Sequence, residues 1–164
     1  RAHALGWRGP ASRSLFLRTL AAGRDPAESY LAWLHDDDAM PAKQREQMRP
    51  LAGAFTDPQR RADAQQVLRD AVAANPKWDW SFLLQVHGLT DEAMAAALQA
   101  GDDAQTMQLS MWSPALASFR AHPRFLELAE RKGLVAYWRE FGPPDGCTVN
   151  STTDAKGDVS PWDC

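Results

Sequence analysis

The residues able to do chemistry in this chain of 164 residues are few and scattered. Four histidines, His3, His35, His87 and His122, lie far apart in the sequence, and none has a catalytic or metal-binding partner at a familiar spacing. Each lies near the end of an expected helix, where a histidine most often bonds terminal carbonyls or favours the negative end of the helix dipole. We therefore expect structural roles for all four.

Clustered carboxylates are the next candidates for chemistry. Asp36, Asp37 and Asp38 could hold a hard cation, but three consecutive carboxylates between helices are typical of a solvated connector. The segment 150–158 contains Asn, Asp and Gly, yet it lacks the ligand spacing and the terminal Glu of a calcium loop. Nucleophile-elbow, phosphate-loop and His-Glu-x-x-His patterns are also missing. The sequence therefore predicts no catalysis, no cofactor and no metal site.

Two cysteines, Cys147 and Cys164, are the remaining reactive side chains, and both fall in the last part of the chain. Composition alone leaves three alternatives open, namely a disulfide, half of a metal site, or neither. No second pair of Cys or His stands nearby at ligand spacing, which makes zinc the weaker alternative.

Overall composition narrows the class of protein. Eighteen basic residues against 21 acidic ones give a net charge of −3, without the basic excess that nucleic-acid binding usually leaves. No apolar run approaches the roughly 20 residues that cross a bilayer. The sequence starts at Arg1 without a signal-peptide pattern. We expect an excised part of a longer protein that neither binds nucleic acid nor spans a membrane here.

The elements that must position these residues are helices. Period-2 alternation and β-branched residues are sparse, and Ala, Leu, Gln, Arg and Glu fill the segments between turn signals, which indicates an all-α fold. Several helices begin with a capping residue followed by proline, as at Asp57-Pro58 and Ser113-Pro114. The expected helices are 11–22, 26–35, 41–55, 58–74, 78–87, 91–100, 103–111, 114–121, 123–132 and 134–141.

Helical hairpins with small residues at their contacts suggest an internal repeat. Residues 45–78 match the 34-residue tetratricopeptide (TPR) pattern in phase, and the following hairpin repeats its turn and second helix. The matching positions, which we expect to pack between helices, are Leu51, Ala52, Phe55, Ala64, Leu68, Ala71 and Pro76 in the best repeat and Gly88, Ala93 and Ala97 in the next.

The last third resembles a more particular family. The strings Trp112-Ser113-Pro114-Ala115-Leu116, His122-Pro123-Arg124-Phe125 and Tyr137-Trp138-Arg139, with a tail ending in Cys164, look like the closing segment of bacterial TPR proteins. That segment commonly follows winged-helix regulators and some cyclase-type signalling proteins. Where the family often has an aromatic in a Trp-Pro-Asp-aromatic-Cys turn, this chain has Gly142-Pro143-Pro144-Asp145-Gly146-Cys147.

The resemblance implies a short α-solenoid of TPR-like hairpins over residues 1–141, closed by divergent capping helices at 112–141. It also implies that the tail, 142–164, is latched by a Cys147–Cys164 disulfide, which would contribute on the order of 3 kcal/mol by loop-closure entropy. Such a bond would place the domain in an oxidising compartment, the periplasm rather than the cytoplasm.

The expected function is non-catalytic binding of a protein or peptide by the interaction or sensory part of a larger bacterial regulator. The candidate groove residues are Arg45, Arg49, Trp78 and Trp80, and an arginine row would favour an acidic peptide. The alternative is a domain that senses a small ligand or metal and is coupled to a transcriptional or cyclase output domain. The oligomeric state stays open.

Overall fold

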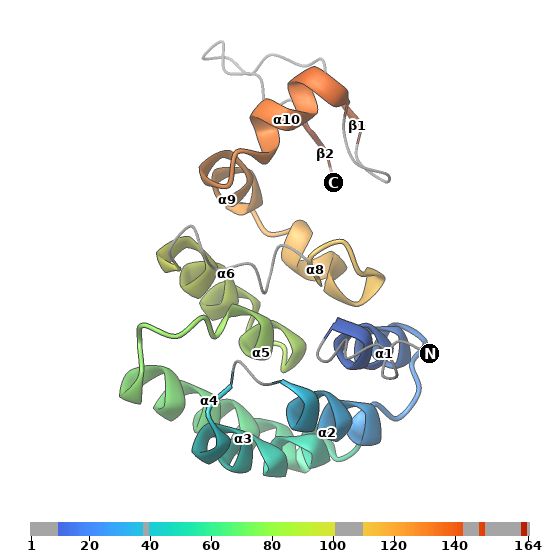
Figure 1. Cartoon of the computed structure of the whole chain (residues 1–164), viewed down its shortest axis with the longest axis vertical. Coiled ribbons are helices and arrows are strands. Elements are labelled where there is room, and N and C mark those ends of the chain that lie inside the picture. The colour runs from blue at the N-terminus through green and yellow to red at the C-terminus, as the bar shows by residue number, and fades with distance from the viewer. Residues whose placement is uncertain (1–9, 38–39, 101–109, 143–147, 150–161, 164) are drawn as a thin grey trace.

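The structure is a computed structural model that describes residues 10–37, 40–100, 110–142, 148–149 and 162–163. The described part is helical apart from one short antiparallel ladder, which confirms the all-α class (Figure 1). The elements are α1 (Pro10–Ala21), α2 (Ala27–Asp36), α3 (Ala42–Met48), η2 (Arg49–Phe55), η3 (Pro58–Arg60), α4 (Arg61–Ala74), α5 (Ser81–Val86), α6 (Thr90–Gln99), η4 (Pro114–Leu116), α8 (Ala117–Arg120), α9 (Phe125–Arg131), α10 (Leu134–Phe141), β1 (Thr148–Val149) and β2 (Trp162–Asp163). The helix expected at 103–111 falls largely outside the described residues.

Local capping explains where several helices begin. The Asp57 carboxylate accepts a hydrogen bond from the Gln59 backbone N–H at 2.9 Å, and Pro58 follows at the first helical position. Ser113 caps η4 in the same way through the Ala115 N–H at 3.3 Å. Each cap satisfies a backbone donor that the first helical turn leaves unpaired. The capping signals in the sequence were therefore correct at these two positions.

The expected helix over 41–55 is divided into α3 and the 3-10 helix η2. Pro50 lies at the start of η2, and it has no backbone N–H to continue the α-helical hydrogen-bond pattern. The tighter winding of η2 turns Leu51, Ala52 and Ala54 into the core.

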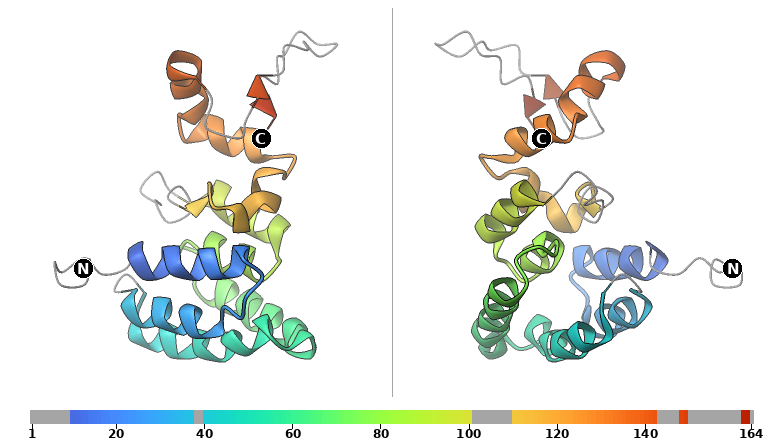
Figure 2. Two further views of the ribbon diagram at one scale, coloured as in Figure 1. Left: turned by 90° about the vertical axis from the view of Figure 1, so that its right-hand side faces the viewer. Right: turned by 60° about the vertical axis from the view of Figure 1, so that its left-hand side comes forward.

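Neighbouring helices pair as hairpins, α1 with α2, α5 with α6, and α9 with α10, and Figure 2 shows α1 lying along α2. The helix α1 also packs against η4. This contact brings the two ends of the segment 10–120 together. In an open stack of repeats each repeat contacts only its neighbours. The hairpins are therefore observed, whereas the stacking of a TPR solenoid is not confirmed.

An aromatic cluster forms the centre of the N-terminal half. Phe16 contacts Tyr30 at 5.4 Å and Trp33 at 6.1 Å between ring centroids. Phe82, from α5, meets the Trp33 ring edge-on at 5.0 Å. All four rings are almost completely buried, so their apolar area is a main source of stability for this half of the molecule.

The structure corrects one part of the expected solvated connector, because the Asp37 carboxylate is buried. Asp37 is buried, and its Oδ2 lies 3.7 Å from Nη2 of Arg13. The Arg13 guanidinium in turn lies 5.2 Å from the Phe82 ring centroid. Asp38 falls outside the described residues.

The C-terminal helices α8 and α9 both pack against α6. Phe119, Phe125 and Trp138 are buried there, and Trp112 contacts the Trp138 ring at 5.8 Å. Arg120 stabilises the connection by donating to the carbonyls of Met111 and Ser113. Two other aromatic side chains of this region, Tyr137 and Phe141, remain 57% and 64% exposed.

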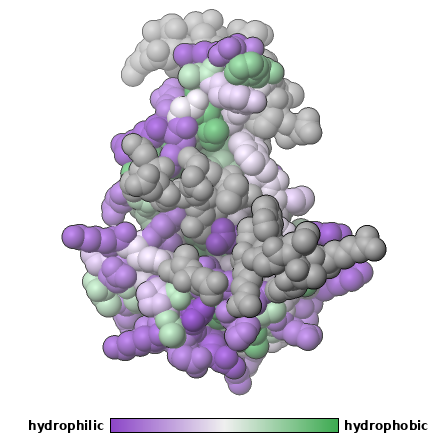
Figure 3. Space-filling model, in the orientation of Figure 1, coloured by the Kyte–Doolittle hydropathy of each residue, from purple (hydrophilic) through white to green (hydrophobic). Residues whose placement is uncertain are grey.

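The described residues on the face drawn in Figure 3 are mostly hydrophilic, with small separate apolar areas. Among the described helices, none has the length and apolar character required to cross a membrane.

Candidate functional site

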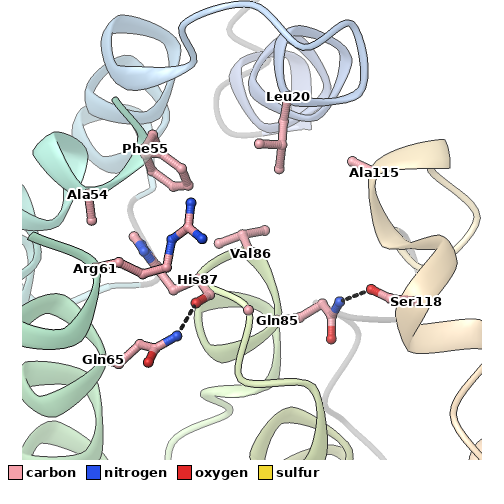
Figure 4. Close-up of a pocket in the computed structure, with 11 residues that line it drawn as sticks. Leu20, Ala54, Phe55, Arg61, Gln65, Gln85, Val86, His87, Ala115 and Ser118 are labelled. Carbon is pink, nitrogen blue, oxygen red and sulfur yellow. Dashed lines mark hydrogen bonds between the residues drawn. The ribbon is translucent and has the colours of Figure 1, made fainter. Parts of the chain in front are cut away.

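A cavity of about 440 Å³ lies between helical segments that are far apart in the sequence (Figure 4). Its walls come from α1, η2, α4, the end of α5 with the following turn, and η4 with α8. The lining residues are Leu20, Ala54, Phe55, Arg61, Gln65, Gln85, Val86, His87, Gly88, Ala115 and Ser118. A volume of this size is in the range of small-molecule sites.

The turn after α5 places His87 in the wall of the cavity. Gly88 adopts φ +80°, and the Gly88 and Leu89 N–H groups donate to the carbonyls of Gln85 and Leu84, which ends the helix in a Schellman motif. Gln65 of α4 donates from Nε2 to the His87 carbonyl at 2.9 Å. The backbone on both sides of the imidazole is therefore fixed.

The imidazole itself is enclosed by aromatic rings. The His87 side chain lies 4.6 Å from the Phe55 ring centroid, tilted by 30°, and 5.8 Å from the Tyr30 ring, edge to face. Burial lowers the pKa of His87 to about 4. The side chain is therefore a neutral imidazole at pH 7, with one ring nitrogen able to donate and the other able to accept.

Two buried polar atoms in the cavity wall have no partner within the described residues. One is Nε2 of His87, and the other is Oε1 of Gln85, whose own Nε2 donates to Oγ of Ser118 at 2.9 Å. Both residues are only 5% exposed. Native proteins pair most buried polar atoms, because an unpaired one costs about 1–3 kcal/mol. Both atoms are closed to water, so they lie behind the surface of the cavity rather than on it.

One of the described lining residues is a cation. The Arg61 side chain, at the start of α4, makes no hydrogen bond or ion pair with another described residue, whereas its backbone N–H donates to the Pro58 carbonyl. Its neighbour Arg60 instead pairs with Asp57 at 3.2 Å, and Arg69 on the same helix pairs with Glu92 at 2.9 Å. Figure 4 shows the Arg61 guanidinium directed toward the space beside Phe55.

Among the described residues, no base is placed to activate the Ser118 hydroxyl, which accepts from Gln85 and has no hydrogen bond to His87. No carboxylate is found among the described residues that line the cavity. No group of three or more His, Cys, Asp or Glu side chains in the described part of the chain is placed to hold a metal ion.

The expected groove residues do not meet in one place. Arg45 donates to the carbonyls of His35 and Asp37 at the end of α2, and Arg49 lies 3.8 Å from Glu46 on the surface. Trp78 and Trp80 contact edge to face at 4.4 Å. Trp80 is 2% exposed and donates from Nε1 to the Asn75 carbonyl at 2.8 Å.

A second hollow of about 260 Å³ lies between α3 and the end of α4. Trp80 lines it together with Lys43, Gln44, Gln47 and Asn75, while Arg45, Arg49 and Trp78 are not among its lining residues. The Nε2 of Gln44 is buried there without a partner in the described part.

Most of the residues assigned to repeat packing are buried. Leu51, Ala52, Ala64, Leu68, Ala93 and Ala97 belong to the core, Phe55 and Ala71 are half-buried, and Pro76 and Gly88 are exposed at turns. Phe55 and Gly88 also line the cavity. Cys147 and Cys164 lie outside the described residues.

Sequence reasoning missed the three polar residues that characterise the cavity, Arg61, Gln85 and His87. His87 was placed correctly at a helix end, but its burial was not expected. The available signal was weak, namely a polar pair interrupted by Val86 at the end of an otherwise apolar helix.

No protein-family model matches this chain, and neither a curated protein nor a solved structure was found to match it.

Proposed function

We propose that this chain is a non-catalytic ligand-binding domain that holds a small molecule in the cavity between α1, η2, α4, α5 and α8. The observation that carries the proposal is the cavity itself, whose wall brings the Arg61 side chain together with Leu20, Phe55 and Val86 from distant parts of the chain. A bound molecule would gain burial against these apolar side chains and a hydrogen bond from the guanidinium. This corresponds to the sensing alternative rather than to peptide binding.

We further infer a regulatory context for the domain. The hairpins and the C-terminal cover support a short TPR-like repeat with a cap, belonging to a larger bacterial regulator. Because the cavity draws its walls from α1 and from η4 with α8, an occupant would contact both ends of the segment 10–120 at once. Such an occupant stabilises the packing of these ends, and a linked output domain could sense that change.

A peptide-binding role is supported by one separate observation, the hollow between α3 and α4. Its lining includes the exposed side chains of Lys43 and Gln47, which an extended peptide could meet with backbone carbonyls. Gln47→Leu should then weaken capture of a peptide partner without affecting a ligand in the larger cavity.

The proposed cellular compartment of the domain is inferred from its two cysteines. Thr148 and Asp163, which adjoin Cys147 and Cys164 in the sequence, pair with each other in the antiparallel β1–β2 ladder. This pairing supports the predicted Cys147–Cys164 disulfide, and with it an oxidising compartment such as the periplasm.

A fragment screen by nuclear magnetic resonance tests the ligand-binding proposal. Fragments that bind should shift the His87 ring and Gln85 amide signals of the whole chain and raise its melting temperature. Ala115→Phe would fill the cavity and abolish these shifts, whereas Ala73→Phe, on the exposed side of α4, is the matched control. Fragments that bind only elsewhere, or that still bind the Ala115→Phe variant, would contradict the proposal.

A further inference from the structure

The helix α5 is joined to the N-terminal helices by ring contacts at both of its ends. At its beginning, the centroid of the Phe82 ring lies 5.0 Å from that of Trp33. Directly after its last residue, the His87 imidazole lies 4.6 Å from the Phe55 ring and 5.8 Å from the Tyr30 ring. We refer to them as the Phe82 contact and the His87 contact. Of the two, the second contains a side chain that can change its charge near neutral pH.

The observed arrangement does not accommodate a protonated imidazole. The Nε2 atom of His87 is closed to water and has no hydrogen-bond partner among the described residues. Protonation makes both ring nitrogens N–H donors, so Nε2 would become an unpaired donor on a buried positive charge. A buried charge without a partner is far more costly than an unpaired neutral atom. Proton uptake therefore favours an arrangement in which this side chain reaches water.

The charged groups around His87 oppose the added proton rather than compensate for it. Arg61 of α4 lines the same cavity, with its guanidinium directed toward the space beside Phe55, so it presents a like charge (Figure 4). From α2 the imidazole meets Tyr30, whose hydroxyl donates to the Met48 carbonyl and whose pKa is raised by burial. The helix η4 has no ionisable side chain, and those of α4, α6 and η2 other than Arg61 lie or pair elsewhere: Arg69 with Glu92, Asp91 with His122, Asp70 with Gln66, Arg49 with Glu46, and Asp63 exposed to solvent.

The structure provides room for the imidazole to move without unwinding α5. The cavity of about 440 Å³ adjoins His87 and Phe55. The turn that ends α5 is held by its own backbone, because the Gly88 and Leu89 N–H groups donate to carbonyls within the same turn. At the other end, the Phe82 ring is buried and has no group that takes up a proton. Loss of the His87 contact would therefore free one end of α5 and leave the other end attached.

We propose that the His87 contact is a pH-sensitive joint between α5 and the pair formed by α2 and η2. In mild acid the imidazole takes up a proton, leaves Phe55 and Tyr30 for the adjacent cavity, and releases this end of α5, while the Phe82 contact holds the other end. The opening is local and reversible rather than a global unfolding. It requires no ligand, so it holds or fails independently of the ligand-binding function.

Thiol labelling of the folded chain measures the opening at each end of α5. Ala54→Cys places a thiol on η2 beside the His87 contact, and Ser81→Cys places one beside the Phe82 contact, both at buried positions. The rate of reaction with N-ethylmaleimide, divided by the rate for the same variant unfolded at the same pH, gives the opening equilibrium constant. Peptide mapping separates the introduced thiol from the natural cysteines.

The expected increase follows from the pKa of the imidazole in the two arrangements. A pKa of about 4 when buried and an ordinary value of 6.5 in water give an increase of about 25-fold for Ala54→Cys between pH 7.5 and pH 5. At pH 5 this variant should react faster than Ser81→Cys, and low concentrations of urea should leave its rate unchanged. Ser81→Cys reacts through global unfolding, so its rate should rise with urea.

Two histidine substitutions in the Ala54→Cys chain are the matched controls. His87→Phe keeps a ring at this position that cannot take up a proton, and it should abolish the increase. His35→Gln removes an exposed histidine and should preserve it. Equal increases in the two backgrounds overturn the proposal. The same conclusion follows if urea at pH 5 accelerates Ala54→Cys and Ser81→Cys alike, because the opening is then global.

A titration of the unsubstituted chain by nuclear magnetic resonance does not depend on these variants. The nuclear Overhauser effect between the His87 and Phe55 rings should disappear at a higher pH than the one between the Trp33 and Phe82 rings. Loss of both effects at the same pH, or persistence of both down to about pH 3.5, overturns the proposed joint.

Discussion

The buried imidazole of His87 predicts a specific loss of stability in mild acid. Its pKa is about 4 in the folded state against a model value of 6.5, because burial disfavours the charged form. Between these pH values the unfolded chain binds a proton that the folded chain excludes. The free energy of unfolding is therefore unaffected by this group above about pH 7 and decreases as the pH falls from about 6.5 to about 4.

The magnitude follows from the difference between the two pKa values. A difference of about 2.5 at 1.36 kcal/mol per unit gives about 3 kcal/mol lost by pH 4, of which about 2 kcal/mol is already lost at pH 5. The measurement is urea unfolding at pH 7.5 and pH 5. His87→Phe cannot titrate and should lose about 2 kcal/mol less than the wild type over this interval.

Two comparisons make the experiment decisive. His35→Gln removes an exposed histidine and should keep the wild-type loss. His87→Phe also removes the unpaired Nε2, so at pH 7.5 it should be as stable as the wild type or more stable by about 1 kcal/mol. If wild type and His87→Phe lose the same free energy between the two pH values, His87 is not buried as a neutral base and the argument for the cavity wall fails.

Three further predictions concern the framework and the tail. Leu68→Ala removes a fully buried side chain and should lower the free energy of unfolding by about 2–5 kcal/mol in urea titrations; a loss below 1 kcal/mol would mean that α4 is not packed as described. Gly88→Ala must adopt φ +80°, so it should cost about 1–2 kcal/mol and shift the His87 ring signals, and an unchanged melting temperature would contradict the left-handed turn after α5. The Cys147–Cys164 disulfide predicts no free thiol in the unfolded, unreduced protein and two thiols after reduction; two reactive thiols before reduction would disprove it.

The helical framework was largely predictable because its signals are local. Asp57-Pro58 and Ser113-Pro114 cap helices through groups two residues away, and the spacing of Ala64 and Leu68 identifies the buried side of α4 without knowledge of its partner. The division of residues 41–55 into α3 and η2 shows the limit of this reasoning. Pro50 was visible in the sequence, yet one continuous helix was expected over 41–55.

The cavity was not predictable in the same way, because none of its polar residues is exceptional in its own segment. Arg60 and Arg61 are adjacent and chemically identical, and only the fold gives one of them Asp57 and leaves the other beside Phe55. His87 becomes a buried neutral base only when η2 and α2 supply Phe55 and Tyr30 around it. A motif records the spacing of residues along one element, whereas this site depends on the packing of α1 against η4, a contact between distant parts of the chain. Chemistry that arises from such a contact can be assigned only after the fold is known, which is why the proposed ligand site rests on the packing of distant segments rather than on sequence pattern.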